Sequence, residues 1–291
     1  MKPARRWHPY ALLAPTLLVL GTFFLYPLLL ALERSFYSWD LLSEPEYVGT
    51  HHYRDLVASG DLVAIAGRTL GYSIIVVAFS MVFGLALAVA LNRDGKFYAF
   101  VRGSIFSAYI VSWVSVALLW LWVLDDDQGA LSRGLRALGL PTQDWLGDPD
   151  VVLYTLAGVT VWKITGYAMV IFLAGLQDIP KSVLEAAALD GATPWRRFWH
   201  VVWPLLRPTA AFVATTSLIL SFQAFDIVRV MTQGGPADAS TVFVYAIYEQ
   251  VFLNFRVGRA SAVTVAFFAL LVLLTVLQLW AWRATSKTRT A

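Results

Sequence analysis

Long runs of hydrophobic residues dominate the chain and alternate with shorter polar stretches. Six runs approach or exceed the length of about 20 residues that a helix needs to cross a bilayer. They cover residues 11–32, 69–91, 103–124, 151–176, 208–228 and 260–282. Lys163 is the only charged residue in the first four runs, and Asp226 lies near the far end of the fifth. The pattern predicts an all-α, polytopic membrane protein with about six transmembrane helices, organised as one domain over residues 1–291.

The start of the chain has two interpretations. The basic segment Met1-Lys-Pro-Ala-Arg-Arg6 precedes a hydrophobic run, as in a signal peptide. However, the run over residues 11–32 is longer than the hydrophobic region of a signal peptide, and no convincing small-x-small cleavage pattern follows it. We therefore expect a retained N-terminal helix, followed by core helices within residues 69–282.

Residues 179–207 form a polar stretch whose pattern predicts two short helices. Ser182 and Glu185 have the spacing of a capping box at the start of the first helix. Gly191 suits the left-handed turn that ends a helix. Thr193 followed by Pro194 is typical of the N-cap and first position of a second helix.

The second short helix is expected to have one apolar face. Large hydrophobic side chains recur at helical spacing at Trp195, Phe198, Trp199 and Val202. Pro204 and Pro208 are expected to break the chain before the fifth hydrophobic run, because proline removes a backbone donor and clashes with the preceding turn.

Composition supports the membrane interpretation and excludes several kinds of chemistry. Hydrophobic residues make up 58% of the chain and charged residues 14%, against about 25% charged in a typical soluble domain. The absence of cysteine excludes disulfides, thiolate metal sites and thiol nucleophiles. The net charge of +3 is small for a nucleic-acid-binding protein.

Motifs for ATP hydrolysis or metal catalysis are also missing from the sequence. No P-loop pattern, nucleophile elbow or H-E-x-x-H motif occurs, and Gly95-Lys96 is followed by phenylalanine. The adjacent histidines His51 and His52 are interpreted as part of a solvated loop. We expect no cofactor and no enzymatic activity, so the energy for uphill transport must come from another chain.

The distribution of basic residues predicts the orientation in the membrane. With a cytoplasmic N-terminus, cytoplasmic segments contain 13 Lys and Arg residues and external segments contain 8. Because cytoplasmic loops carry the excess of basic residues, both termini are expected in the cytoplasm. The same orientation places residues 179–207 in the cytoplasm.

Polar residues inside the hydrophobic runs are candidates for a solute site. Lys163 lies near the middle of the fourth run, where a charge is costly unless it meets a partner or a wet cavity. Tyr167 lies one helical turn further on. The fifth run supplies Ser217, Ser221, Gln223 and Ala224. The alternative for the serines is a packing role, with hydroxyls bonded back to their own helix. Gly67 and Gly71 have the spacing of a helix-packing motif.

A family resemblance appears in the polar stretch. The segment Glu185-Ala-Ala-Ala-Leu-Asp-Gly-Ala192, followed by Phe198 and Pro204, resembles the EAA loop of permease subunits of binding-protein-dependent ABC importers. The resemblance implies a type I ABC importer permease fold. It also implies a cytoplasmic coupling helix that docks in a groove of an ATPase subunit, through residues that include Glu185, Ala186, Ala187, Asp190 and Gly191.

A second resemblance covers about residues 100–280. Trp162-Lys-Ile-Thr-Gly-Tyr167 and Thr232-Gln-Gly-Gly-Pro236 are similar to segments of the maltose-type carbohydrate permeases. The resemblance implies a mid-membrane solute site at Lys163, Tyr167, Ser217, Ser221 and Ala224, beside which we place Gln223. The maltose permease has asparagines at the positions of Ser221 and Ala224, so the pocket differs. Lys163 would suit a phosphorylated or otherwise anionic solute, such as a glycerophosphate.

Together these features predict a permease subunit of an ATP-driven importer for a sugar or sugar-like solute, in a bacterial or archaeal inner membrane. The resemblance implies a second permease subunit, two ATP-binding subunits and an extracytoplasmic solute-binding protein as partners, besides membrane lipid and with no nucleic acid. An ion-coupled secondary transporter and a non-transporting scaffold are the alternatives. The former needs an ion site, for which Asp226 is the only acidic residue within the predicted spans.

Overall fold

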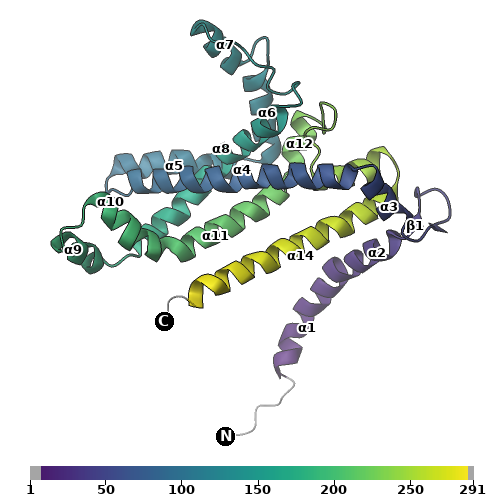
Figure 1. Cartoon of the computed structure of the whole chain (residues 1–291), viewed down its shortest axis with the longest axis horizontal. Coiled ribbons are helices and arrows are strands. Elements are labelled where there is room, and N and C mark those ends of the chain that lie inside the picture. The colour runs from purple at the N-terminus through teal and green to yellow at the C-terminus, as the bar shows by residue number, and fades with distance from the viewer. Residues whose placement is uncertain (1–7, 288–291) are drawn as a thin grey trace. The chain divides into compact units, whose positions relative to one another are not determined.

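The structure is a computed structural model that describes residues 8–287 and consists mainly of helices (Figure 1). Four of the 13 basic residues that are predicted to be cytoplasmic lie outside the described residues, namely Lys2, Arg5, Arg6 and Arg289. The chain divides into two compact units. One is made of residues 1–64 and 246–291, and the other of residues 65–245.

Five helical segments are long and apolar enough to cross a membrane. They are Leu12–Arg34, Asp61–Ala90, Val152–Gln177, Pro194–Phe222 and Val257–Gln278. A sixth span is formed if the pair Lys96–Ile110 and Trp113–Leu124, which is bent by 101°, is counted as one. The prediction of an all-α polytopic protein with about six spans is confirmed. The predicted continuous helix over 103–124 is wrong, because the chain turns sharply after Ile110.

The unit of residues 65–245 contains most of the helices. In order they are α4 (Asp61–Ala90, which begins in the other unit), α5 (Lys96–Ile110), α6 (Trp113–Leu124), α7 (Ala130–Ala137), α8 (Val152–Gln177), α9 (Lys181–Leu189), α10 (Pro194–Arg197), η2 (Phe198–Val202), α11 (Trp203–Phe222) and α12 (Phe225–Met231). Helix α13 (Phe243–Tyr248) begins in this unit and ends in the other.

Helix α8 is the centre of this unit and packs against both α5 and α11. Of its 26 residues, 14 are buried. Small and large apolar side chains of α4, α8 and α11 form the core, namely Ala88, Ala168, Met169, Phe172, Leu173, Ala210 and Val213. Gly84 lets α4 approach α8 closely, since a Cβ at this position would overlap Ala168. The predicted pair Gly67 and Gly71 makes no such approach, because a Cβ at either position meets nothing within 4 Å.

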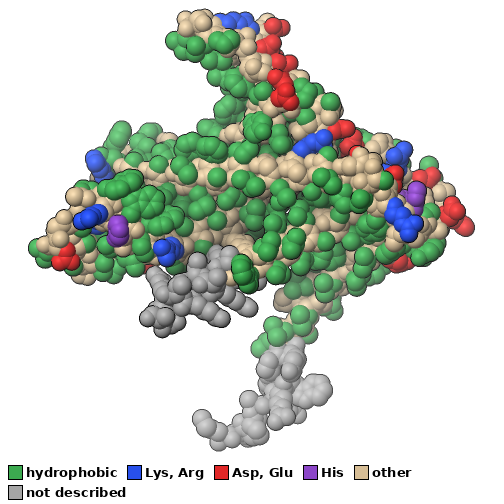
Figure 2. All heavy atoms as spheres, in the orientation of Figure 1, with side chains coloured by type: hydrophobic (Ala, Val, Ile, Leu, Met, Phe, Trp, Pro, Cys, Tyr) green, Lys and Arg blue, Asp and Glu red, His purple; other side chains and the backbone are tan. Residues whose placement is uncertain are grey.

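Many apolar side chains outside the core are exposed along the length of the membrane-spanning helices. Figure 2 shows hydrophobic side chains along the helices, whereas charged side chains gather near helix ends and in loops. In α4, for example, Ile74 and Val82 are exposed although they lie inside the span. Exposed apolar faces of this length fit a surface covered by lipid or by other membrane helices.

The fifth span differs from the sequence prediction. Helices α10 and α11 and the π-helical turn η2 between them form one helical segment from Pro194 to Phe222. Neither Pro204 nor Pro208 breaks it. In η2 the Trp203 N–H bonds to the carbonyl of Phe198, five residues back. This wider turn accommodates the ring of Pro204, which would clash with the carbonyl four residues earlier in a regular α-helix.

The second unit contains α1 (His8–Leu20), η1 (Gly21–Leu25), α2 (Tyr26–Arg34), β1 (Tyr37–Ser38), β2 (Glu46–Tyr47), α3 (His51–Ala58), η3 (Glu249–Leu253) and α14 (Val257–Lys287). The two strands are antiparallel, with Tyr37 opposite Tyr47. Helix α14 packs against α2, α3 and β1.

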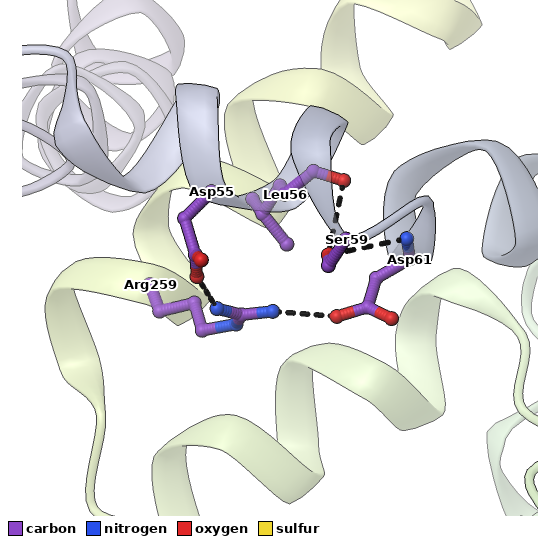
Figure 3. A network of polar contacts seen from close by, with 5 residues as sticks. All are labelled: Asp55, Leu56, Ser59, Asp61 and Arg259. Carbon is purple, nitrogen blue, oxygen red and sulfur yellow. Dashed lines mark hydrogen bonds and ion pairs between the residues drawn. The ribbon is translucent and has the colours of Figure 1, made fainter.

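Polar contacts fix the start of α14 in this unit. Arg259 forms ion pairs with Asp55 of α3 and, at 2.6 Å, with Asp61 in the first turn of α4 (Figure 3). His52 Nε2 lies 3.1 Å from the carbonyl oxygen of Tyr37. The interpretation of His51 and His52 as a solvated loop is wrong, because they form the first turn of α3 and His52 is half-buried against β1.

Candidate functional site

The polar stretch after α8 folds as the predicted pair of short helices, α9 and α10. Gly191 ends α9 with a φ of 75°, in the left-handed region. The Ala192 N–H donates to the Ala187 carbonyl at 3.1 Å, which closes the end of the helix. The Thr193 hydroxyl accepts from the Arg196 N–H at 3.4 Å, and Pro194 occupies the first turn of α10. These three local predictions are confirmed.

The predicted capping box at the start of α9 is not formed. The helix begins at Lys181 with Pro180 as N-cap, and the Val183 N–H donates to the Pro180 carbonyl. Ser182 is therefore already inside the helix, where its hydroxyl cannot reach the N–H groups of a first turn that starts before it. Glu185 is exposed and free of a capping role.

The hairpin of α9 and α10 is polar overall but exposes large apolar side chains at its surface. Leu189 at the end of α9 is 89% exposed, and Trp195 in α10 is 72% exposed. Trp195 stacks edge-on against Trp199, with ring centroids 5.6 Å apart. Large exposed apolar residues rimmed by charge are typical of a surface that docks another protein.

Lys163 is buried in the middle of α8, with 1% of its surface exposed. Its ammonium donates to the carbonyls of Ala108 at 3.2 Å and Tyr109 at 3.1 Å, and also to that of Val111. The nitrogen lies 4.8 Å from the ring centre of Trp113, within range of a cation–π interaction. All these partners belong to the corner where α5 ends and α6 begins.

The corner itself has a simple local structure. Val111 and Ser112 are extended, and the Ser112 hydroxyl caps α6 by accepting from the Ser115 N–H at 3.2 Å. Tyr109 stacks on Tyr167 of α8, with ring centroids 4.9 Å apart. The structure thus brings the two predicted site residues of α8, Lys163 and Tyr167, to the same corner.

The predicted residues of the fifth span have mainly internal partners. Ser217 is buried and accepts a hydrogen bond of 3.2 Å from Ser80 of α4. Ser221 is buried and donates to the Leu218 carbonyl of its own helix at 2.7 Å. Ala224 is buried, whereas Gln223 is exposed at the end of α11. Solute contact by these residues stays a prediction.

Sequence reasoning missed the corner and an apolar groove. The groove has a volume of about 1280 Å³ and is lined by α4, α5 and α8, with Phe79, Phe83, Ile105 and Trp162 among its walls. A sugar site needs convergent hydrogen-bonding groups, so this surface fits hydrocarbon rather than sugar. Within residues 8–287, no three His, Asp or Glu side chains gather in a way that could hold a metal ion.

Comparison with known proteins gives consistent matches. The sequence profile of the family described as binding-protein-dependent transport system inner membrane component matches residues 80–287. The sn-glycerol-3-phosphate transport system permease protein UgpA of Agrobacterium fabrum is 33% identical over 272 residues, which cover 93% of this chain and 92% of that protein. UgpA of Yersinia pestis is 32% identical and covers 96% of both chains.

Solved structures show the same fold. A chain of a bacterial ABC transporter involved in the import of the acidic polysaccharide alginate superposes with a TM-score of 0.80 at 24% identity, over 97% of this chain and 96% of that chain. The inward-facing methionine transporter MetNI gives a TM-score of 0.58 at 19% identity, over 77% of this chain and 95% of that chain.

Proposed function

Since this chain belongs to the family of binding-protein-dependent transport system inner membrane components, we propose that it forms one half of the pore of an ATP-driven importer. The chain is a multi-pass permease of the sugar-importing ABC class with the type I fold, and a permease is not an enzyme. Its proposed partners are a second permease subunit, two ATP-binding subunits that hydrolyse ATP, and an extracytoplasmic solute-binding protein. The proposed location is the bacterial or archaeal inner membrane, and the two compact units would act as one permease domain.

The main support for this proposal is the hairpin formed by α9 and α10, residues 181–197. A tightly turned pair of short helices at the end of α8 exposes Leu189 and Trp195, together with the acidic side chains of Glu185 and Asp190. The surface available to an ATPase groove comprises Glu185, Ala186, Ala187, Asp190 and Gly191. The left-handed turn at Gly191 joins α9 directly to α10, and we propose that a movement of α9 is passed on to α10 through this turn.

The charge distribution supports a cytoplasmic position for this hairpin. In Figure 1 the loop between α4 and α5 lies at the same end of its unit as α9 and α10. Basic residues are concentrated in the α4–α5 loop, in the first half of α5 and in α9 and α10, namely Arg93, Lys96, Arg102, Lys181, Arg196 and Arg197. Since basic residues favour the cytoplasmic side, we propose that this end and both termini face the cytoplasm.

For the solute, the relatives favour a sugar-like molecule with an anionic group. The UgpA proteins are named for sn-glycerol 3-phosphate, and the alginate transporter for an acidic polysaccharide. We propose that Tyr167 and Gln223, which retain exposed surface, face the translocation path. The buried residues of the predicted site would shape the wall behind them, namely Lys163, Ser217, Ser221 and Ala224.

Reconstitution tests the function. The permease pair, the ATPase and the binding protein are placed in proteoliposomes, and uptake of radiolabelled sn-glycerol 3-phosphate and of maltose is measured. Uptake should require ATP and the binding protein. Uptake that persists without ATP and collapses when the proton gradient is dissipated would instead establish a secondary transporter.

Two matched variants test the docking surface. Leu189→Asp adds a charge to the exposed apolar tip of α9, and Leu138→Asp adds one beside α7, where Leu138 is 76% exposed. We expect Leu189→Asp to lose the ATPase subunits on co-purification and Leu138→Asp to retain them. Equal retention by both variants would remove the hairpin from the ATPase interface.

A further inference from the structure

Helix α5 ends inside the span, where its carbonyl groups need partners. The end of α5 accepts hydrogen bonds from Lys163, which is the twelfth of the 26 residues in α8. The corner between α5 and α6 therefore lies near mid-membrane depth. The last four carbonyls of any helix lack intrahelical donors. No water is available in hydrocarbon to satisfy them, so a helix that stops there must find donors in the protein.

The local sequence favours a new helix start at Ser112, which caps α6, but it contains no residue at the corner that forces a sharp bend. Sharp kinks usually arise at proline, at Gly/Ser pairs, at π-bulges or where a side chain inserts into the hydrogen-bond ladder. The residues at the corner are Ile110-Val-Ser-Trp113, with neither proline nor glycine, and residues 96–124 contain no proline. Of these causes, the inserted side chain is present. The Lys163 ammonium donates to three carbonyls at the end of α5, those of Ala108, Tyr109 and Val111.

The donor capacity of Lys163 is fully used at the corner. An ammonium has three N–H donors, and the three carbonyl partners account for all of them. The positive charge also lies at the negative end of the α5 dipole, which stabilises it. With 1% of its surface exposed, Lys163 has neither a spare donor nor an open face for a solute.

We propose that Lys163 is a positioning residue that creates and holds the corner between α5 and α6. It acts with two neighbours on the same face of α8, Gly166 and Tyr167, at spacings of three and four residues. Gly166 lets the α5 backbone approach, since a Cβ there would overlap the Ile105 carbonyl. Tyr167 stacks on Tyr109 in the last turn of α5. We call Lys163, Gly166 and Tyr167 the corner dock.

The effect of the corner dock on the shape of α5 and α6 is independent of the transport function proposed above, and only the uptake measurement below rests on that function. The consequence of the corner dock is that the bend is held by a contact from α8, in addition to the Ser112 cap within residues 96–124. Without the lysine, α5 and α6 can restore their backbone hydrogen bonds only by joining into a straighter helix.

Spin-label distances measure this directly, because the chain has no native cysteine. Cysteines at Phe100 on α5 and Trp122 on α6, which are 73% and 60% exposed, carry the labels. With a rise of about 1.5 Å per residue, the two positions lie about 18 Å apart at the observed bend of 101° and about 33 Å apart in a straight helix. The full-length chain is measured in lipid nanodiscs.

The expected result is a short distance with the native lysine and a shift of about 5–15 Å to longer distance in Lys163→Met, which keeps the length of the side chain and removes its donors. Lys163→Arg, which keeps donors and charge, should retain the short distance. Lys181→Met removes an exposed lysine and serves as the control. A short, unbroadened distance in Lys163→Met would overturn the proposal.

A second measurement covers the case in which Lys163→Met fails to fold. Lys163→Gln retains an amide donor and should fold with a broadened distance distribution. In the reconstituted transporter, a positioning role predicts that Lys163→Gln lowers the maximal uptake rate of anionic and neutral solutes by the same factor, with KM unchanged. A selective rise of KM for the anionic solute would show direct solute contact and overturn the positioning role.

Discussion

A single methyl group at Gly166 is expected to separate α5 from α8. An ideal Cβ at this position would lie 2.5 Å from the Ile105 carbonyl oxygen and 2.9 Å from the Phe106 Cα. Both are backbone atoms, so neither can rotate away as a side chain would. The two helices must therefore move apart to accept Gly166→Ala.

The cost follows from the displacement. Relief of the contact to about 3.3 Å needs a separation of about 0.8 Å, which stretches the Lys163 hydrogen bonds of 3.1–3.2 Å toward the limit of about 3.5 Å and beyond. Overpacking costs about 1–3 kcal/mol, and weakened bonds to a charged donor cost about 1.5–3 kcal/mol more. The better helix propensity of alanine returns about 1 kcal/mol. The net loss should be about 1.5–5 kcal/mol.

Gly158 offers a matched control on the same helix, because it is exposed and a Cβ there meets nothing within 4 Å. Gly158→Ala should be neutral or stabilising by up to about 1 kcal/mol. Thermal unfolding in detergent, followed by tryptophan fluorescence at one fixed scan rate, should place the Gly166→Ala midpoint about 5–10 °C below that of Gly158→Ala. Midpoints within about 2 °C of each other would refute the close α5–α8 contact.

Three further outcomes are expected. Gly191→Val should abolish uptake, whereas Gly191→Asn, which tolerates the left-handed conformation, should retain most of it. Removing both carboxylates with Asp55→Asn and Asp61→Asn should lower the unfolding midpoint more than Arg259→Met, because the arginine side chain is only 14% exposed and would lose its partners, whereas the carboxylates are 46% and 50% exposed and can hydrate. Burial lowers the pKa of His52 below its ordinary value of 6.5, so the unfolded chain binds the proton more readily. Stability should therefore fall as pH drops below about 6.5 and level off below the folded-state pKa, and in His52→Gln this component should vanish from the pH profile of the unfolding midpoint.

Local backbone requirements were readable from the sequence. Gly191, Thr193 and Pro194 each act on the turn in which they lie, so their types predicted the turn between α9 and α10 without knowledge of distant contacts. The capping box failed on the same local scale, because Pro180 started α9 before Ser182 could cap it. The residue types indicate several possible helix starts. Which of them is used depends on the conformation of the chain between α8 and α9.

The membrane spans were also determined by the sequence, since hydrophobic length is a property of the linear chain. Their interruptions were not. The prolines at 204 and 208 remain inside one helix because a π-helical turn makes room. The proline-free run over 103–124 instead breaks after its eighth residue, Ile110.

The physical reason lies in where the compensating groups come from. Three carbonyls at the corner, those of Ala108, Tyr109 and Val111, accept from Lys163, which follows them by 52–55 residues. The sequence by itself determined that a charge would lie at mid-membrane depth and that it would need a partner. Only the packing of α8 against α5 decided that the partner is a broken helix of the same chain, because which backbone groups stand beside that charge is a property of the fold.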